Sequence, residues 1–189
     1  MSLEILRQSL IEAPVVKKGD YSYVIHPITD GVPEIKPELL NEVVDEMQKR
    51  IAKCGSFDKI VTIEAMGIPL ASTLSLKMKI PFVIIRKRSY GLSGEIHVEQ
   101  STGYSKSNLY INGLEKGDRI VIVDDVLSTG GTLSAVISTI KKLGVIIKGI
   151  YIVVDKGNVA KQITDKFKVA IDILVNIDVI EDKVVIKKI

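Results

Sequence analysis

Six stretches of the chain are dominated by aliphatic residues and lack a helical period. Short apolar runs of about four to eight residues are typical of strands inside a sheet. A further stretch, residues 21–33, begins with β-forming residues and is then broken by prolines, which predicts a strand and then a loop. The six strands are expected within residues 58–63, 81–87, 119–125, 145–157, 168–176 and 182–189.

Between these strands, apolar residues recur at intervals of three and four, which predicts amphipathic helices. The longest pattern runs from Pro37 to Ile51, and proline suits the first position of a helix. A helix from Leu133 to Ile140 is expected to close at Gly144. Shorter helices are expected at residues 3–10, with Ser2 as N-cap, and at residues 67–78 and 159–167.

The alternation of strands and helices predicts an α/β fold with a mainly parallel central sheet flanked by helices. The 189 residues suffice for one domain with a real core. Residues 87–107 interrupt the pattern, because they follow neither a period of two nor one of 3.6. Such a segment is typically a lid or a binding loop, although the weak alternation of Glu95–Glu99 also allows a β-hairpin.

Composition narrows the class of protein. The net charge of +3 is too small to indicate nucleic-acid binding. The single cysteine, Cys54, cannot form an internal disulfide, which fits a reducing compartment. No apolar run reaches the roughly 18 residues of a membrane helix, and the N-terminus does not resemble a signal peptide. We therefore expect a cytoplasmic globular protein.

The stretch "VIVDDVLSTGGTL" places two aspartates at the end of a predicted strand, before a turn of small residues. Ligands of open α/β sheets bind at the carboxyl ends of strands. Glycine amides, hydroxyls and a helix N-terminus in residues 128–132 suit a phosphate. Asp124 and Asp125 would repel that phosphate unless they accept hydrogen bonds from sugar hydroxyls, and a magnesium ion could bridge. The combination predicts a site for ribose 5-phosphate; the alternative is an ordinary strand–turn–helix with solvated acids.

The same stretch resembles the phosphoribosyl pyrophosphate (PRPP) signature of the type I phosphoribosyltransferases. The resemblance implies that fold, with a hood of about residues 1–36 plus the C-terminal strands and a mobile lid of about residues 87–106. It also implies a homodimer. "YVIHPITD" resembles the hood segment of adenine phosphoribosyltransferases, and the overall pattern resembles archaeal hypoxanthine/guanine phosphoribosyltransferases. The implied 5′-phosphate residues are Val126, Leu127, Ser128, Thr129, Gly130, Gly131 and Thr132.

Further motifs indicate where the diphosphate binds. "IEAMGIPLA" resembles the family's pyrophosphate loop, with Ala65, Met66 and Gly67 as contacts. Arg86, Lys87 and Arg88 end a strand, and cations there suit a diphosphate leaving group, although a solvated strand end is the alternative. The resemblance makes Lys106 a second diphosphate contact, and we expect Asp124, Asp125, Arg86 and Lys106 to be catalytic. Glu64 is expected to bond the ribose side or to orient its loop.

The base is expected at the end of "YIVVDKGN". Lys156 has three donors and no acceptor, so it suits a 6-oxo group better than the 6-amino group of adenine. The alternative is a surface lysine. Val24 and Ile25 are expected to sandwich the base, and His26 to be structural. Other hypoxanthine-guanine enzymes carry an acid where this chain has Ser128, which leaves the proton acceptor open; Glu99 is a candidate base or a solvated acid.

These observations predict a purine salvage enzyme that converts hypoxanthine or guanine and PRPP to IMP or GMP and pyrophosphate. Mg²⁺ is the expected cofactor, with Asp124 and Asp125 as candidate ligands. An adenine phosphoribosyltransferase is the first alternative. A PRPP-sensing transcriptional regulator is the second, but such regulators usually add a DNA-binding domain or a basic face.

Overall fold

A six-stranded sheet forms the centre of the computed structural model, which describes residues 3–19, 21–98 and 108–187. Its strand order is β10-β9-β8-β7-β3-β4, and every neighbouring pair is parallel except β10 with β9. The predicted mainly parallel sheet is therefore confirmed. Its strands are β3 (Lys59–Ile63), β4 (Phe82–Ile85), β7 (Arg119–Leu127), β8 (Ile146–Asp155), β9 (Ile171–Ile180) and β10 (Lys183–Ile186).

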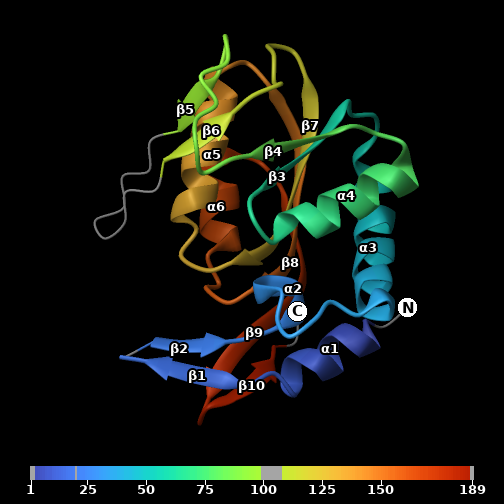
Figure 1. Ribbon diagram of the computed structural model, residues 1–189, viewed down its shortest axis with the longest axis vertical. Helices are drawn as coiled ribbons and strands as arrows, with labels where there is room; N and C mark the ends of the chain where they lie inside the picture. The colour runs from blue at the N-terminus through green and yellow to red at the C-terminus, as the bar shows by residue number, and fades with distance from the viewer. Residues whose placement is uncertain (1–2, 20, 99–107, 188–189) are drawn as a thin grey trace.

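Helices cover both faces of this sheet, as Figure 1 shows. On one face lie α3 (Pro37–Ile51) and α4 (Gly67–Met78); on the other lie α5 (Gly131–Lys142) and α6 (Ala160–Phe167). Strand β7 shows why its sequence is almost wholly apolar: Val121 and Val123 enter the core cluster on one face, and Ile120 and Ile122 enter the cluster on the other. Burial on both faces explains the uninterrupted aliphatic runs.

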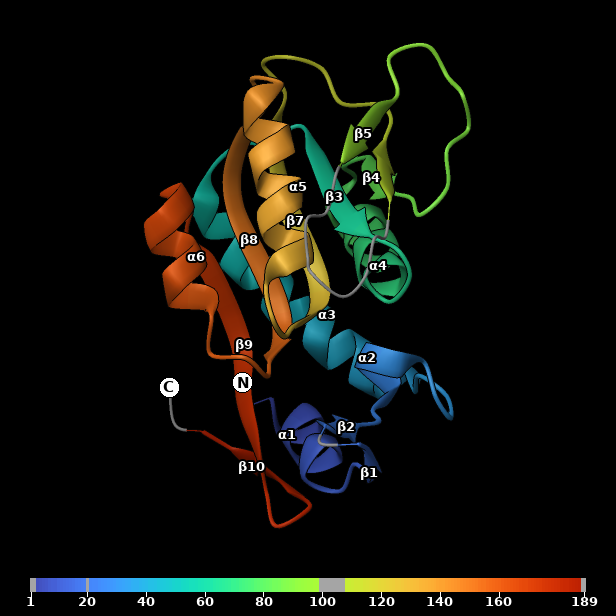
Figure 2. The ribbon, with the colours of Figure 1, turned by 90° about the vertical axis from the view of Figure 1, so that its left-hand side faces the viewer.

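A smaller body sits at the end of the sheet where β9 and β10 project (Figures 1 and 2). It contains α1 (Glu4–Ile11), β1 (Val15–Lys18), β2 (Tyr21–Val24) and α2 (Pro27–Asp30), and β1 pairs with β2 in an antiparallel hairpin. Lys17 Nζ lies 2.7 Å from Asp182 Oδ2, which ties this body to the turn between β9 and β10. We call these four elements with β10 the hood.

Three sequence expectations needed correction here. The segment after β2 is not only a loop, because Pro27–Asp30 form a helical turn, and the strand β1 was not expected. Leu3, not Ser2, occupies the N-cap position of α1. For residues 87–107, in contrast, the alternative of paired strands is confirmed where the structure describes them: β5 (Ile96–Val98) pairs with β6 (Leu109–Ile111), and residues 99–107 lie outside the described part. Three-residue and four-residue strands are too short for a reliable period.

The remaining helices match their predicted positions closely. Helix α4 spans the expected residues 67–78, and α5 ends where Gly144 adopts a φ of +75°. A 3-10 turn, η1 (Ala52–Cys54), follows α3. Within residues 3–19, 21–98 and 108–187, no helix has the length and apolar character needed to span a bilayer.

Candidate functional site

The predicted site residues converge because they follow four neighbouring parallel strands. Lys156 follows β8, the acid pair lies near the carboxyl end of β7, Glu64–Gly67 follow β3, and Arg86 follows β4. The sheet order β8-β7-β3-β4 arranges these groups in a line along one edge of the sheet, the carboxyl edge where ligands of such sheets bind. A ligand across this edge would meet a lysine, then two acids, then a glycine loop, then an arginine.

Asp124 and Asp125 lie inside strand β7, which continues to Leu127 rather than ending before them. Asp125 is 7 % exposed, and its backbone N–H donates to Asp124 Oδ1 over 3.1 Å. Burial and the adjacent charge of Asp125 raise the pKa of Asp124 well above its usual range. Burial raises the pKa of Asp125 to about 6. The pair therefore favours a partner that supplies hydrogen-bond donors or positive charge.

A magnesium ion fits the oxygens beside Asp124. The Thr62 hydroxyl is fully buried and has no hydrogen-bond partner among the described residues. A Cβ on Gly67 would lie 1.9 Å from Thr62 Oγ1 and 2.8 Å from Asp124 Oδ1, so both oxygens pack against the Gly67 backbone, and only a glycine fits there. In the described part of the chain no group of three acidic, His or Cys side chains could hold a metal. Magnesium commonly completes such a shell with substrate oxygens and water.

The turn after β7 has the form expected of a phosphate site. Gly130 has a φ of +74°, and helix α5 starts at Gly131, so Thr132 already belongs to the helix. The first amides of a helix have no intrahelical partner and can bind an anion. A cavity of about 140 Å³ borders this turn. It is lined by Asp124, Val126, Leu127, Ser128, Thr129, Gly130, Thr132, Leu133 and Ile152.

The basic end of the line is organised by an acid. Glu64 Oε2 lies 2.7 Å from Arg86 Nε, and Glu64 Oε1 accepts a hydrogen bond from the backbone N–H of Lys87 over 2.7 Å. The hydrogen bond to Lys87 is a contact through which Glu64 could orient the segment after β4, as expected. Arg88 lies over the ring of Tyr90 at 4.8 Å, and Lys87 is exposed. Lys106 and Glu99 lie outside the described residues.

Lys156 occupies the other end of the line and is partly buried. Its Nζ donates to the carbonyl oxygen of Val24 over 3.3 Å, which links the base end of the site to the hood. Burial lowers the pKa of Lys156, while the charges of Asp30 and Asp125 oppose this shift. Asp155, 2 % exposed, accepts from the backbone N–H groups of Gly157 and Asn158, which holds the turn that carries the lysine.

The three hood residues of interest take different positions. Val24 is 2 % exposed and lines a cavity of about 160 Å³ together with Lys156, whereas Ile25 is half-buried. His26 is 1 % exposed; its Nδ1 accepts from the Ile28 N–H, and its Nε2 lies 2.9 Å from Ser9 Oγ. The prediction that His26 is a satisfied structural histidine is confirmed.

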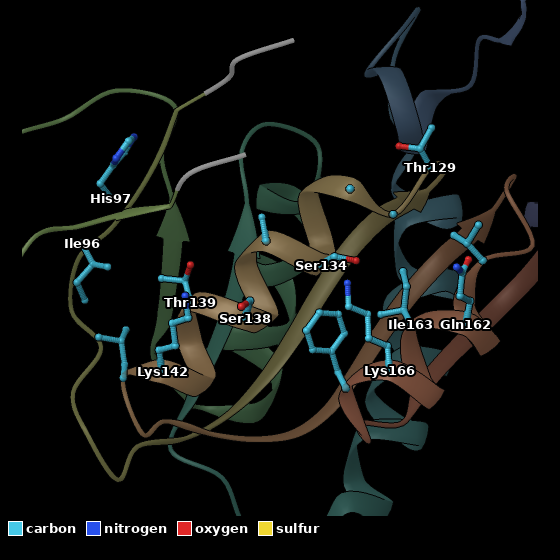
Figure 3. A pocket seen from close by; sticks show the side chains of 16 residues that line it. Ile96, His97, Thr129, Ser134, Ser138, Thr139, Lys142, Gln162, Ile163 and Lys166 are labelled. Carbon is cyan, nitrogen blue, oxygen red and sulfur yellow. The ribbon is translucent and has the colours of Figure 1, made fainter. Parts of the chain in front are cut away.

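A larger cavity, of about 910 Å³, lies between α5, α6 and β5 (Figure 3). Thr129 and Gly130 line it from the phosphate turn, and Lys142, Lys166 and His97 contribute its polar rim. Neither the acid pair, Arg86 nor Lys156 lines it. Choosing the site by cavity volume alone would therefore miss the carboxyl edge, where the predicted residues meet.

Sequence reasoning missed two residues of the carboxyl edge. Thr62 looks like an ordinary β-forming residue, and only its burial without a partner draws attention to it. Asp155 precedes a Lys-Gly-Asn turn, a pattern in which an aspartate often bonds to the backbone two residues on, so a signal was present.

Comparisons with known proteins agree with this geometry. A family model described as a phosphoribosyl transferase domain matches residues 34–184. A protein of Methanocaldococcus infernus named hypoxanthine/guanine phosphoribosyltransferase is 55 % identical over 182 residues, 96 % of this chain and 99 % of that protein. A protein of the same name from Methanocaldococcus jannaschii is 54 % identical over 185 residues, with 96 % and 99 % covered.

Solved structures support the same fold. The adenine phosphoribosyltransferase of Saccharomyces cerevisiae superimposes with a TM-score of 0.76 at 19 % identity, covering 92 % of this chain and 98 % of that one. The enzyme of Leishmania tarentolae gives 0.76 at 20 % identity, covering 93 % and 88 %. At such identities the likeness concerns the fold alone, whereas the family model and the archaeal relatives concern the sequence itself. The chain belongs to the phosphoribosyl transferase family.

Proposed function

We propose that this protein transfers the phosphoribosyl group of PRPP to hypoxanthine or guanine, forming IMP or GMP and pyrophosphate. The observation that carries the choice of base is Lys156, which lies at the carboxyl end of β8, beside the acid pair and under the hood. The archaeal relatives named for hypoxanthine and guanine, more than half identical to this chain, support the same choice.

The linear order of the site suits displacement at the anomeric carbon. With the ribose hydroxyls on Asp124 and Asp125, the base lies toward Lys156 and the diphosphate toward Arg86 and Lys87. A base nitrogen attacks the carbon as the bond to the diphosphate oxygen breaks, and the proton of that nitrogen leaves to solvent. Arg86, Lys87 and Arg88 stabilise the negative charge that develops on the leaving group. The turn from Ser128 to Thr132 holds the 5′-phosphate.

Magnesium, when bound, would neutralise charge on the departing diphosphate. Asp124 and the Thr62 hydroxyl are the protein groups that would face it, directly or through water. Asp125 would face the base side instead, since besides Asp124 the charges that act on it are those of Lys156 and Asp30. We accordingly assign the two acids different tasks, one toward the metal and diphosphate and one toward the ribose and base.

Lys156 discriminates between purines by its donors. An ammonium group donates to the 6-oxo oxygen of hypoxanthine or guanine but cannot accept from the 6-amino group of adenine. A buried donor that faces another donor leaves both unsatisfied, which disfavours adenine strongly. The contact with the Val24 carbonyl is long, at 3.3 Å, so the lysine can exchange it for a base oxygen without losing a strong bond.

An activity panel tests this proposal. Wild-type protein is assayed with PRPP, Mg²⁺ and adenine, hypoxanthine, guanine or xanthine, and Lys156→Ala is compared with Lys161→Ala, an exposed lysine on α6. Loss of one charge-assisted bond should lower kcat/KM for hypoxanthine about 10- to 100-fold in Lys156→Ala. Lys161→Ala should behave like wild type. Preference of the wild type for adenine, or full hypoxanthine activity in Lys156→Ala, would refute the assignment.

We also propose an oligomeric state, a cellular location and a lid, which the family resemblance implies. The protein acts as a homodimer in the cytoplasm, with PRPP and a purine as its small-molecule partners, and the segment 87–106 closes over the diphosphate. Lid closure would exclude water, which otherwise hydrolyses PRPP. Analytical ultracentrifugation at micromolar concentration tests the dimer, since a monomeric mass there would contradict it.

A further inference from the structure

Glu64 places a carboxylate at the end of the site where a diphosphate is expected, which by simple electrostatics is unfavourable. Its side chain is 17 % exposed and touches two successive residues of the chain after β4. Oε2 lies 2.7 Å from Arg86 Nε, and Oε1 accepts from the Lys87 N–H over 2.7 Å. The backbone N–H of Glu64 donates to the carbonyl of Ile85 over 3.1 Å. One glutamate therefore joins the ends of β3 and β4 at three points.

Arg86 is held from its other side as well. Its backbone N–H donates to the Tyr110 carbonyl over 2.9 Å, and the Tyr110 N–H donates back to the Arg86 carbonyl over 2.7 Å. Strand β6, which contains Tyr110, is one strand of the antiparallel pair β5–β6. The main chain of Arg86 is thus fixed between the sheet and this pair, and Glu64 determines where its side chain goes.

The contact between Glu64 and Arg86 has an unusual feature. Arg86 Nε is buried, and although it lies 2.7 Å from the carboxylate, it has no well-aligned hydrogen-bond acceptor among the described residues. The Glu64 carboxylate therefore compensates the buried Nε–H of Arg86 by its charge. Because it contacts Nε, the two terminal nitrogens of the guanidinium, Nη1 and Nη2, can bind another anion. A guanidinium fork binds phosphate oxygens in pairs, so its orientation decides how well it does so.

We propose that Glu64 is a positioning residue: it acts through Arg86 and the Lys87 backbone to aim the guanidinium fork at the departing diphosphate. This inference rests on the proposed function, because it concerns the diphosphate end of the same site. A carboxylate can serve Arg86 and the Lys87 N–H at once. A glutamine amide has only one accepting oxygen. It can therefore accept from either Arg86 or the Lys87 N–H, and its NH₂ group then faces the remaining donor.

The test is a double-mutant cycle with Glu64→Gln, Arg86→Ala and the double variant. The readouts are the inhibition constant of pyrophosphate, the KM for PRPP and the KM for hypoxanthine. In Glu64→Gln the first two should rise about tenfold, within the range of coupled contacts, while the KM for hypoxanthine changes less than about twofold. In the Arg86→Ala background, Glu64→Gln should change the pyrophosphate constant less than about twofold, because its target is gone.

Asp45→Asn is the matched control, since it breaks another 2.7 Å ion pair, with Lys77, away from the carboxyl edge. It should leave all three constants unchanged. Thermal unfolding of each variant, and calorimetric titration of the folded proteins with magnesium pyrophosphate, separate misfolding from lost positioning. Additive effects of the two substitutions would overturn the inference, as would tighter pyrophosphate binding in Glu64→Gln. A wild type that neither binds pyrophosphate nor consumes PRPP would instead overturn the proposed function.

Discussion

At the scale of single residues, the site is built from groups that are costly without a ligand. Asp125 is withdrawn from solvent inside β7, its neighbour Asp124 is half-buried, and the buried Thr62 hydroxyl has no partner among the described residues. An unsatisfied buried polar group typically costs about 1–3 kcal/mol. Sugar hydroxyls and a metal ion would satisfy these groups, so the cost in the free protein becomes affinity for the ligand.

The acid pair makes PRPP binding depend on pH. Burial raises the pKa of Asp125 to about 6, and magnesium PRPP favours the ionised carboxylate, so binding expels a proton. Affinity should therefore be full above about pH 7 and fall about tenfold by pH 5, one unit below that pKa. Isothermal titration across this range, in buffers of different ionisation enthalpy, measures both the affinity and the released proton.

Asp125→Asn is the informative comparison, because PRPP itself titrates near pH 6. The variant should bind PRPP more weakly by about 1.5–3 kcal/mol at pH 7.5. Its remaining pH dependence should move to lower pH, because Asp124 no longer has a like charge beside it. Wild-type affinity in the variant, or the same pH profile, would show that Asp125 does not hold the ribose.

Gly67 is required by close approach rather than by backbone conformation. Its Cβ would meet Thr62 Oγ1 at 1.9 Å and Asp124 Oδ1 at 2.8 Å. Gly67→Ala should destabilise the fold by about 1–3 kcal/mol, as other overpacked sites do, and should weaken PRPP binding by displacing Asp124. Combining it with Thr62→Ala should restore part of the stability in urea unfolding. A Gly67→Ala variant as stable as wild type would contradict the crowding.

At the scale of elements, the sheet supplies fixed positions and the segment after β4 supplies a separately organised turn. Glu95 stabilises that turn with three hydrogen bonds. It accepts them from the Ser89 hydroxyl, from the Tyr90 N–H over 2.9 Å and from Asn112 Nδ2 over 2.8 Å. The bond from Asn112, followed by those from Ser89 and Tyr90, lowers the pKa of Glu95 to about 2. One half-buried side chain thus holds the beginning of the proposed lid to the loop that follows β6.

Removing this side chain should loosen the turn without affecting the sheet. In Glu95→Ala, hydrogen exchange at the amides of Tyr90 and Gly91 should accelerate about tenfold or more, while amides of β7 exchange as in wild type. Glu115→Ala, an exposed glutamate outside the turn, is the control. If the segment is a lid, magnesium PRPP should slow exchange across residues 87–95 in wild type. Equal exchange with and without ligand would mean that the turn is a fixed structure.

At the scale of the whole molecule, the hood and the sheet meet through residues that are distant in sequence. Lys156 reaches Val24, and Lys17 pairs with Asp182. His26 lies within the hood between α1 and α2: its Nδ1 accepts from Ile28, so Nε2 carries the proton and donates to Ser9. Burial, aided by the nearby charge of Lys156, lowers the pKa of His26 to about 4.

This buried histidine should make the fold sensitive to acid. Between about pH 6.5 and 4 the unfolded chain binds a proton at His26 that the folded chain does not, so stability falls as pH falls through this window, by up to about 3 kcal/mol. The acid pair acts in the opposite direction, since its raised pKa values favour the folded state as pH falls. His26→Gln should remove the histidine part of the pH dependence in urea unfolding.

His97→Gln is the matched control, because the chain has only two histidines and His97 is exposed. It should leave the pH profile of the free energy of unfolding unchanged. An unchanged profile in His26→Gln would mean that His26 does not resist protonation in the fold.

The sequence by itself determined the class of fold and predicted the chemistry along its edge. Aliphatic runs located the strands of the large sheet because a strand buried on both faces must be apolar at nearly every position. The helical period of Pro37–Ile51 persisted long enough to be certain of a helix. The acid pair and its glycine turn indicated a ribose phosphate because few other ligands need carboxylates and a phosphate cradle side by side.

Only the tertiary structure decided which of these groups touch. The strands β1, β5 and β6 have three or four residues, too few for a period, and each forms as one strand of an antiparallel pair. The contacts of Glu64 with Arg86 and of Lys156 with Val24, and the close approach of Gly67 to Thr62 and Asp124, join residues whose spacing in sequence carries no information. Parallel neighbours in a sheet need not be consecutive in the chain, so the line from lysine to arginine follows from strand order, which sequence patterns alone do not specify.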